Sequence, residues 1–110
     1  MNIEELREYA LSLEYVEECT PFGDETLVFK TNGKMFMAMG IYNSPLQFNV
    51  KCDPAKAIEL REQYGAVQPG YHMNKKHWNT VIIDGSLNKK LLKQFISDSY
   101  KLVLKIKNNV

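Results

Sequence analysis

Residues 27–41 read Leu-Val-Phe-Lys-Thr-Asn-Gly-Lys-Met-Phe-Met-Ala-Met-Gly-Ile, and they carry the strongest indication of fold in the chain. Two segments rich in aromatic, β-branched and other apolar residues, 27–30 and 34–41, lie on either side of Asn32-Gly33. Asn-Gly is the strongest short hairpin signal, because a type I′ turn needs a positive φ at both central positions. The stretch therefore predicts two antiparallel strands joined by a tight turn.

The residues around this hairpin extend the sheet. Apolar and polar side chains alternate without interruption over 46–52, which is typical of a strand with one buried and one solvated face. Residues 78–83 predict a further strand, and an extra short strand near 16–20 is an open alternative. Because the connections are short, we expect one antiparallel sheet.

Helix-capping residues precede three segments with helical character. Asn2 with Glu5 is a candidate capping box, Asp53 precedes proline, and Ser86 is the expected cap of a long last helix. The expected element order is α-β-β-β-α-β-α, an α+β fold with the helices packed on one face of the sheet. The predicted helices cover 3–13, 54–64 and 87–106.

Composition limits the classes of protein. The 110 residues are 45% apolar and 25% charged, which is ordinary for a globular protein, so we expect a single domain over 1–110. No apolar run reaches the ~18 residues of a membrane span, and the N-terminus lacks a signal-peptide pattern. We therefore expect a cytoplasmic protein that does not enter a membrane.

The net charge of +1 hides an uneven distribution. Residues 1–25 hold eight acidic side chains and one basic one, a net charge of −7, whereas the remainder hold thirteen basic and five acidic ones, a net charge of +8. Such a distribution can steer a charged partner to one face. Solvated faces of surface helices would give the same pattern, so charge alone leaves the partner open.

One short segment gathers the chemically active side chains. Residues 69–81 read Pro-Gly-Tyr-His-Met-Asn-Lys-Lys-His-Trp-Asn-Thr-Val and include both histidines and the only tryptophan. Loops held by a rigid scaffold often carry binding residues, so the basic and aromatic loop 69–78 within this segment is the candidate binding surface. The candidate site residues are Tyr71, His72, Asn74, Lys75, Lys76, His77 and Trp78, together with Lys34 beside the hairpin turn.

The segment 69–81 also resembles the signature of the MmcQ/YjbR family of small bacterial proteins. Residues 21–23 (Pro-Phe-Gly), 29–36 and 99–103 agree with the family in the same order along the chain. Many members have a Pro-Gly turn after the first helix, where this chain has Glu14-Tyr15. The resemblance implies a CyaY/frataxin-like fold and a "double wing" DNA-binding motif, which makes DNA the expected partner.

The candidate residues suit DNA, but other uses stay open. Lys75 and Lys76 can neutralise phosphates, Asn74 can bond a phosphate or a base edge, and the aromatic rings and histidines offer flat faces for stacking. Lys34 would contact DNA from a hairpin wing. Trp78 can instead pack inside the protein, and the tyrosine and histidines can instead hold the loop together. The same loop would also suit an acidic protein partner or a small ligand.

Catalysis and metal binding have less support. Cys19 and Cys52 match no zinc spacing, so we expect reduced, unpaired thiols, with Cys52 facing the core. His72 and His77 are five residues apart in a loop, unlike the helical pair of a metalloprotease. We expect a monomeric, non-catalytic protein without metal or cofactor.

The acidic first helix keeps one metal-binding alternative open. Glu4, Glu5 and Glu8 are similar in placement to the acidic ridge of frataxin-like iron-binding proteins, although this is an analogy at the level of fold.

Overall fold

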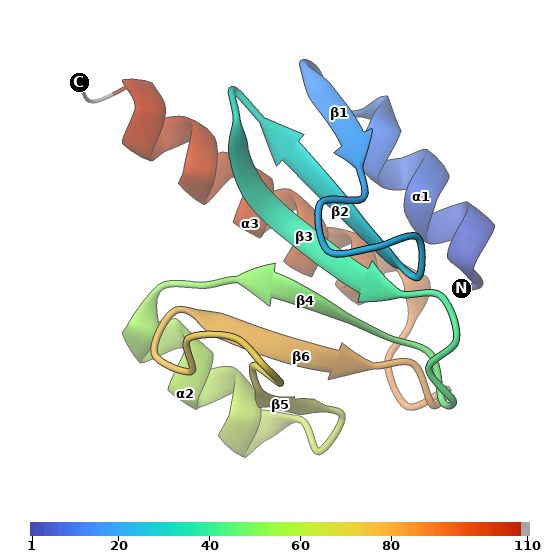
Figure 1. The fold of residues 1–110 in the computed structure, drawn as a ribbon. Coiled ribbons are helices and arrows are strands. Elements are labelled where there is room, and N and C mark those ends of the chain that lie inside the picture. Colours follow the sequence, from blue (N-terminus) through green and yellow to red (C-terminus); the bar gives the residue numbers. More distant parts are fainter. Residues whose placement is uncertain (109–110) are drawn as a thin grey trace.

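A computed structural model describes the backbone of residues 1–108 and the side chains of residues 1–104. The elements are α1 (Ile3–Ser12), β1 (Val16–Cys19), β2 (Thr26–Thr31), β3 (Lys34–Gly40), β4 (Gln47–Lys51), α2 (Pro54–Gln63), β5 (Val67–Pro69), β6 (Trp78–Ile82) and α3 (Lys89–Asn108). The strands form one antiparallel sheet in the order β1-β2-β3-β4-β6-β5. In Figure 1 the helices lie behind the sheet, and the loops 20–25 and 70–77 lie on its opposite face. The expected α+β fold is confirmed.

The hairpin between β2 and β3 forms at the predicted turn. Asn32 and Gly33 have φ values of 52° and 78°, the positive values that a type I′ turn requires. A register shift farther along the pair leaves Phe36 as the extra residue of a β-bulge. Phe36 and Met37 are consequently both fully buried, and the Phe36 ring meets the Tyr100 ring of α3 edge-on at 5.5 Å. The bulge thus brings the Phe36 ring into contact with the Tyr100 ring of α3.

Two of the three predicted helix caps form as expected. The Asn2 side chain accepts a hydrogen bond from the Glu5 backbone at 2.8 Å, and the Glu5 carboxylate accepts one from the Asn2 backbone at 3.2 Å. Asp53 accepts a bond from the Lys56 backbone at 3.4 Å at the start of α2. These caps satisfy backbone donors that the first helical turn leaves unpaired.

The third predicted cap was wrong. Ser86 donates from its hydroxyl to the Asp84 carboxylate at 2.6 Å, and its backbone N–H bonds the same oxygen at 2.9 Å. Asn88 takes the capping position instead, and its side chain accepts from the Leu91 backbone at 2.8 Å. An Asp-Gly-Ser sequence favours a side-chain-closed turn, and this turn delays the start of α3 to Lys89.

The sheet contains two strands in addition to the four whose positions the sequence predicted. β1 is the open alternative near 16–20, and it pairs antiparallel with β2. β5 was not predicted; it pairs with β6 through three residues, of which Val67 is opposite Val81. A strand of three residues that ends in proline is too short to show an alternation of apolar and polar side chains in the sequence. Before β1, Tyr15 has a φ of 61°, a conformation that glycine adopts more easily.

The core lies between the sheet and the helices. Leu6, Phe29, Phe48 and Ile96 are fully buried members of one cluster that joins α1, β2, β4 and α3. Ser99 of α3 ties the helix to the sheet, because its hydroxyl donates to the Phe36 carbonyl at 2.6 Å and accepts from the Lys51 backbone at 2.8 Å. None of the helices within residues 1–108 combines the length and the apolar character that crossing a membrane would need.

Candidate functional site

The candidate loop, residues 70–77, folds against the face of the sheet that the helices leave uncovered. In the β4–β6 pair, Thr80 is opposite Asn49 and Trp78 is opposite Lys51, so these side chains share the uncovered face. The Thr80 hydroxyl donates to the Asn49 side chain at 2.5 Å and accepts from the Tyr71 backbone at 2.8 Å. Thr80 therefore fastens the start of the loop to the sheet.

Trp78 is a packing residue of this loop. Its side chain is only 8% exposed, and it is not part of the helix-facing core cluster formed by the described residues. Gly70 crosses directly over it: a Cβ at Gly70 would lie 2.8 Å from Trp78 Cβ and 2.9 Å from the Trp78 carbonyl oxygen. Only glycine permits this approach. Trp78 thus takes the packing alternative, and its indole is not open to a partner.

Asn74 shapes the far end of the loop. Its side-chain oxygen accepts hydrogen bonds from the backbones of Lys76 at 2.9 Å and His77 at 3.3 Å. Its carbonyl oxygen accepts from the Trp78 backbone at 3.0 Å. The side-chain oxygen of Asn74 is therefore engaged in closing the turn, whereas the predicted bond to a phosphate would use its amide nitrogen as the donor.

Arg61 of α2 holds the loop from the other side, and the sequence did not single it out. Its Nε donates to the Asn79 side chain at 2.7 Å, and its Nη2 donates to the carbonyl oxygens of Lys75 and of Trp78, the latter at 3.3 Å. Asn79 is 2% exposed, so this contact reaches into the interior. The only local signal for Arg61 was a basic residue in the last helical turn, which is too common to be informative.

Five of the predicted site residues remain exposed together on the loop: Tyr71, His72, Asn74, Lys75 and Lys76. The rings of Tyr71 and His72 lie against each other, with centroids 4.0 Å apart and a tilt of 47°. Lys75 Nζ donates to the Gly70 carbonyl at 3.2 Å, and among the described residues Lys76 has no side-chain partner. The loop thus presents two cations beside an aromatic pair.

The other two predicted residues lie apart from this group. His77 is partly buried, and its carbonyl oxygen accepts from the Cys52 backbone at 2.8 Å, which ties the loop to the end of β4. Lys34 is exposed and is the first residue of β3. The turn between β2 and β3 lies well away from the loop before β6 in Figure 1. The structure therefore does not bring Lys34 into the same site.

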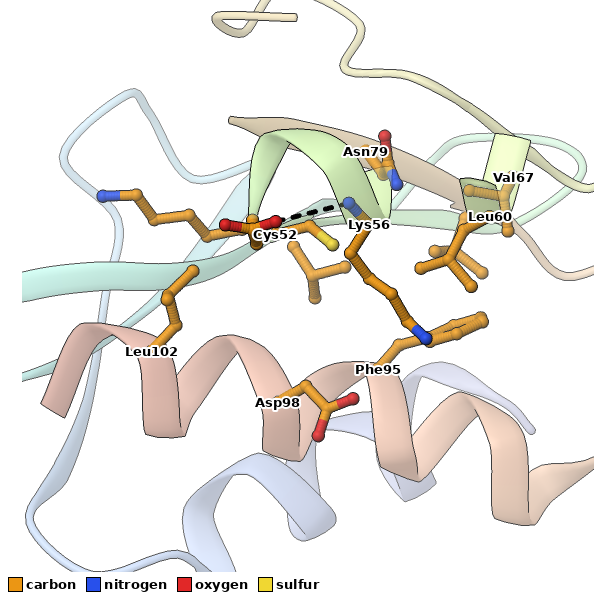
Figure 2. A pocket seen from close by; sticks show the side chains of 12 residues that line it. Cys52, Lys56, Leu60, Val67, Asn79, Phe95, Asp98 and Leu102 are labelled. Carbon is orange, nitrogen blue, oxygen red and sulfur yellow. Dashed lines mark hydrogen bonds between the residues drawn. The ribbon is translucent and has the colours of Figure 1, made fainter. Parts of the chain in front are cut away.

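A cavity of ≈ 210 Å³ lies on the helix side of the sheet, between α2 and α3. Figure 2 shows Leu60 and Phe95 among its apolar walls, with Lys56, Asp98 and Cys52 around it. Burial raises the pKa of the Cys52 thiol, and the nearby Asp53 and Asp98 carboxylates raise it further. Cys52 and Cys19 are both free thiols, as predicted, and Cys52 is half-buried on the helix side.

We predict slow alkylation of Cys52 in a Cys19→Ala variant. The raised pKa of Cys52 keeps the thiol protonated as pH rises through the range where free cysteine ionises, and only the thiolate reacts. Iodoacetamide labelling at pH 8.5 should therefore be slower in the folded protein than in the same protein unfolded in urea. Equal rates would contradict a half-buried thiol and would reopen a nucleophilic role.

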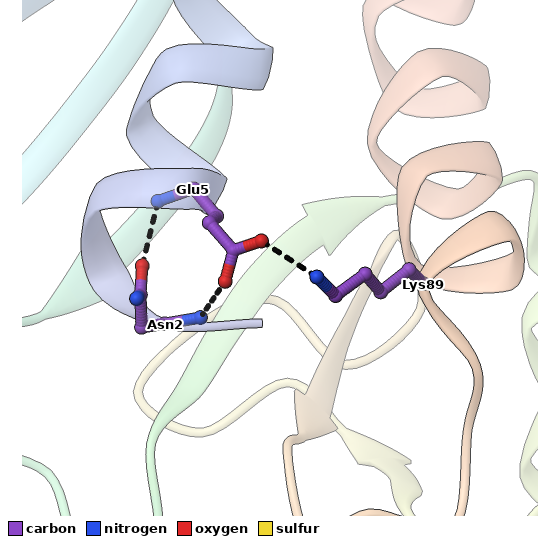
Figure 3. Close-up of polar contacts among 3 residues, drawn as sticks. All are labelled: Asn2, Glu5 and Lys89. Carbon is purple, nitrogen blue, oxygen red and sulfur yellow. Dashed lines mark hydrogen bonds and ion pairs between the residues drawn. The ribbon is translucent and has the colours of Figure 1, made fainter.

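One carboxylate of the acidic first helix, that of Glu5, is already bonded within the protein. Figure 3 shows Glu5 between Asn2 and Lys89, and the Lys89 ammonium donates to its Oε2 at 2.8 Å. The hydrogen bond from Lys89, followed by that from Asn2, lowers the pKa of Glu5. Among residues 1–104 no three His, Cys, Asp or Glu side chains converge as a metal site would require. The metal-binding alternative therefore has no assembled ligand set in the described part of the chain.

Comparisons with known proteins agree with this fold. The YjbR family model matches residues 11–102. A protein of Escherichia coli O157:H7 named YbdF is 42% identical over 101 residues, 92% of this chain and 83% of that protein. The E. coli K12 protein YjbR is 31% identical over 102 residues, covering 92% and 86% of the two chains. Both are described as uncharacterized.

Solved structures show the same architecture. A crystal structure of Deinococcus radiodurans protein DR2400 has a TM-score of 0.89 and 39% identity, covering 94% of this chain and 79% of that one. A crystal structure of a Pseudomonas syringae protein has a TM-score of 0.80 and 27% identity, covering 94% and 99%.

Proposed function

The chain belongs to the YjbR family, and from that premise we propose that it is a non-catalytic DNA-binding protein. In this proposal, the loop 70–77 contacts the phosphate backbone of DNA through Lys75 and Lys76. One observation carries the proposal: a rigidly held loop presents these two lysines beside the exposed Tyr71–His72 pair. We propose further that the protein acts as a monomer in the cytoplasm, without a metal or a cofactor.

The loop is held in place before any partner arrives. The backbone of the loop is bonded at three places. Thr80 accepts from the backbone of Tyr71, Asn74 accepts from that of Lys76, and Arg61 donates to the carbonyl oxygen of Lys75. Ordering a mobile loop on binding would weaken affinity, so a loop already fixed by its own protein contributes more of its contact energy to binding. This arrangement suits recognition of a repeating backbone whose phosphates are regularly spaced.

The charge distribution supports approach from this side. Five of the eight acidic side chains of residues 1–25 belong to α1 and β1, which lie at the β1 edge of the sheet, whereas the loop precedes β6 near the opposite edge. Glu18 is paired with Arg7 at 2.5 Å, and Glu5 is paired with Lys89. The remaining carboxylates of α1 and β1 would repel a polyanion from that edge, which favours approach on the side of the loop.

Replacing Lys75 and Lys76 together by alanine should weaken binding to all duplexes alike. Each lost phosphate contact should reduce the slope of log affinity against log salt by about 0.9. Stability should change by less than about 0.5 kcal/mol for exposed charges. Fluorescence anisotropy with two unrelated duplexes at several salt concentrations measures both effects, and thermal melting checks the fold.

A charge-matched control separates the loop from net charge. Lys90 and Lys101 are exposed on α3, on the helix side of the sheet, and their double replacement by alanine removes the same charge. This control should retain most of the affinity. If the control loses as much affinity as the loop variant, or if the parent does not bind duplex near physiological salt, the proposal fails. An acidic protein partner or a small ligand would then become the leading hypothesis for the loop.

A further inference from the structure

A groove of ≈ 410 Å³ lies on the uncovered face of the sheet, between the two loops that cross it. Its floor includes Ala38 and Asn49 from β3 and β4. One wall includes Phe22 from the loop 20–25, and the other includes Tyr71 and His72 from the loop 70–77. Segments about fifty residues apart in the chain therefore face each other across a single groove.

The rims of this groove are aromatic and exposed. The side chain of Phe22 is 70% exposed and that of Tyr71 is 62% exposed, which is unusual for rings of this size. The floor between them is low, because Ala38 and Gly40 contribute little or no side chain. Apolar surface left uncovered at the edges of a hollow is typical of a binding site. Exposed aromatic side chains therefore line the groove from both of the loops that border it.

The floor offers polar groups to the edge of such a ring. Asn49 accepts from Thr80 through its side-chain oxygen, and among the described residues no acceptor meets its amide nitrogen. Gln47 also lines the groove. Carboxamides pair well with the edges of heterocyclic bases, which present both donors and acceptors. A purely hydrocarbon ring would leave these amides unused.

A cationic hollow adjoins the groove. Gln47 and Tyr71 line both, and the second hollow also includes Lys75. Tyr71 thus separates a ring-sized groove from a site with a positive charge. A nucleotide has this same arrangement, with a flat base on one side of its sugar and a phosphate on the other.

We propose that this groove holds an unpaired nucleobase of a DNA strand between Phe22 and the Tyr71–His72 pair, with Lys75 at the neighbouring phosphate. The inference rests on the proposed function and adds a substrate class to it: single-stranded or locally unpaired DNA. Paired bases in a duplex are stacked on their neighbours and cannot enter a groove of this kind. Stacking on aromatic side chains tolerates any base, so we expect little sequence preference.

Three labelled probes of one sequence test the inference: the single strand, the same strand with abasic sites replacing its central bases, and the full duplex. The parent should bind the single strand about tenfold more tightly than the abasic strand. Phe22→Ala should remove most of that difference and leave duplex binding nearly unchanged. Tyr71→Ala should also remove most of the difference between the intact and abasic strands, and it is compared on those two probes alone. Phe22→Leu, which keeps an apolar side chain without a ring, should behave like Phe22→Ala.

Ile58→Ala is the matched control, because Ile58 is 54% exposed but lies on α2, on the other side of the sheet. It should bind all three probes like the parent. Equal affinity for the intact and abasic strands would overturn the inference, while duplex binding that depends on Lys75 and Lys76 would leave the proposed function standing. A preference for the intact strand without duplex binding would support the groove and refute the duplex proposal. Absence of binding to all probes would refute both.

Discussion

Replacing Trp78 by alanine is expected to lower the free energy of unfolding by about 3–5 kcal/mol. Trp78 is 8% exposed and Gly70 packs closely against its Cβ, so removal of the indole leaves a cavity beneath the loop. The loop cannot collapse far into this cavity, because Thr80 holds the backbone of Tyr71 and Arg61 holds the carbonyl oxygen of Lys75. Urea denaturation followed by circular dichroism measures the loss.

Two variants bracket this result. Trp78→Phe keeps part of the apolar volume and should cost clearly less than alanine. Tyr71→Ala, which removes an exposed ring from the same loop, should change stability by less than about 1 kcal/mol. If Trp78→Ala were as stable as Tyr71→Ala, the indole would not be a packing residue, and its role as a contact to DNA would return.

Replacing Arg61 by alanine should lower the free energy of unfolding by about 2–3 kcal/mol and loosen the candidate loop. The change removes the donor to the buried Asn79 side chain at 2.7 Å and the donors to the carbonyl oxygens of Lys75 and Trp78. A buried acceptor without a donor costs more than the hydrogen bond itself contributes. Affinity for duplex DNA should therefore fall even though Arg61 lies beneath the loop.

Stability and binding need separate measurements for this variant. Denaturation gives the stability, and anisotropy at a temperature where the variant is fully folded gives the affinity. Arg61→Lys should recover little, because one ammonium cannot reproduce a guanidinium that bonds three acceptors. Lys56→Ala, on the same helix, removes a charge but no bond to the loop and should bind like the parent. A fully folded Arg61→Ala protein with unchanged affinity would show that loop rigidity does not matter for binding.

The amino-acid sequence determined the elements whose signals are local. Asn32-Gly33 makes the hairpin turn because its two residues tolerate positive φ, and neighbouring residues hardly influence that preference. Asn2 and Asp53 cap their helices through contacts three residues away. The alternation predicted over 46–52 appears in β4 as buried Phe48 and Val50 between partly exposed neighbours. The family resemblance rested on short segments as well, namely 69–81, 21–23, 29–36 and 99–103, and the family is confirmed.

Only the tertiary structure decided which residues of the candidate site are exposed and which residues hold them in place. β5 exists because β6 offers it a partner, and Asn88 caps α3 because Asp84 has already engaged Ser86. Arg61 reaches the loop from α2, and Phe22 faces Tyr71 only when the sheet brings their loops together. Such contacts depend on positions far apart in the chain, and residue type does not reveal them. The sequence could therefore single out loop 69–78 as a candidate site, but only the packed sheet shows that Trp78 is buried and Tyr71 exposed.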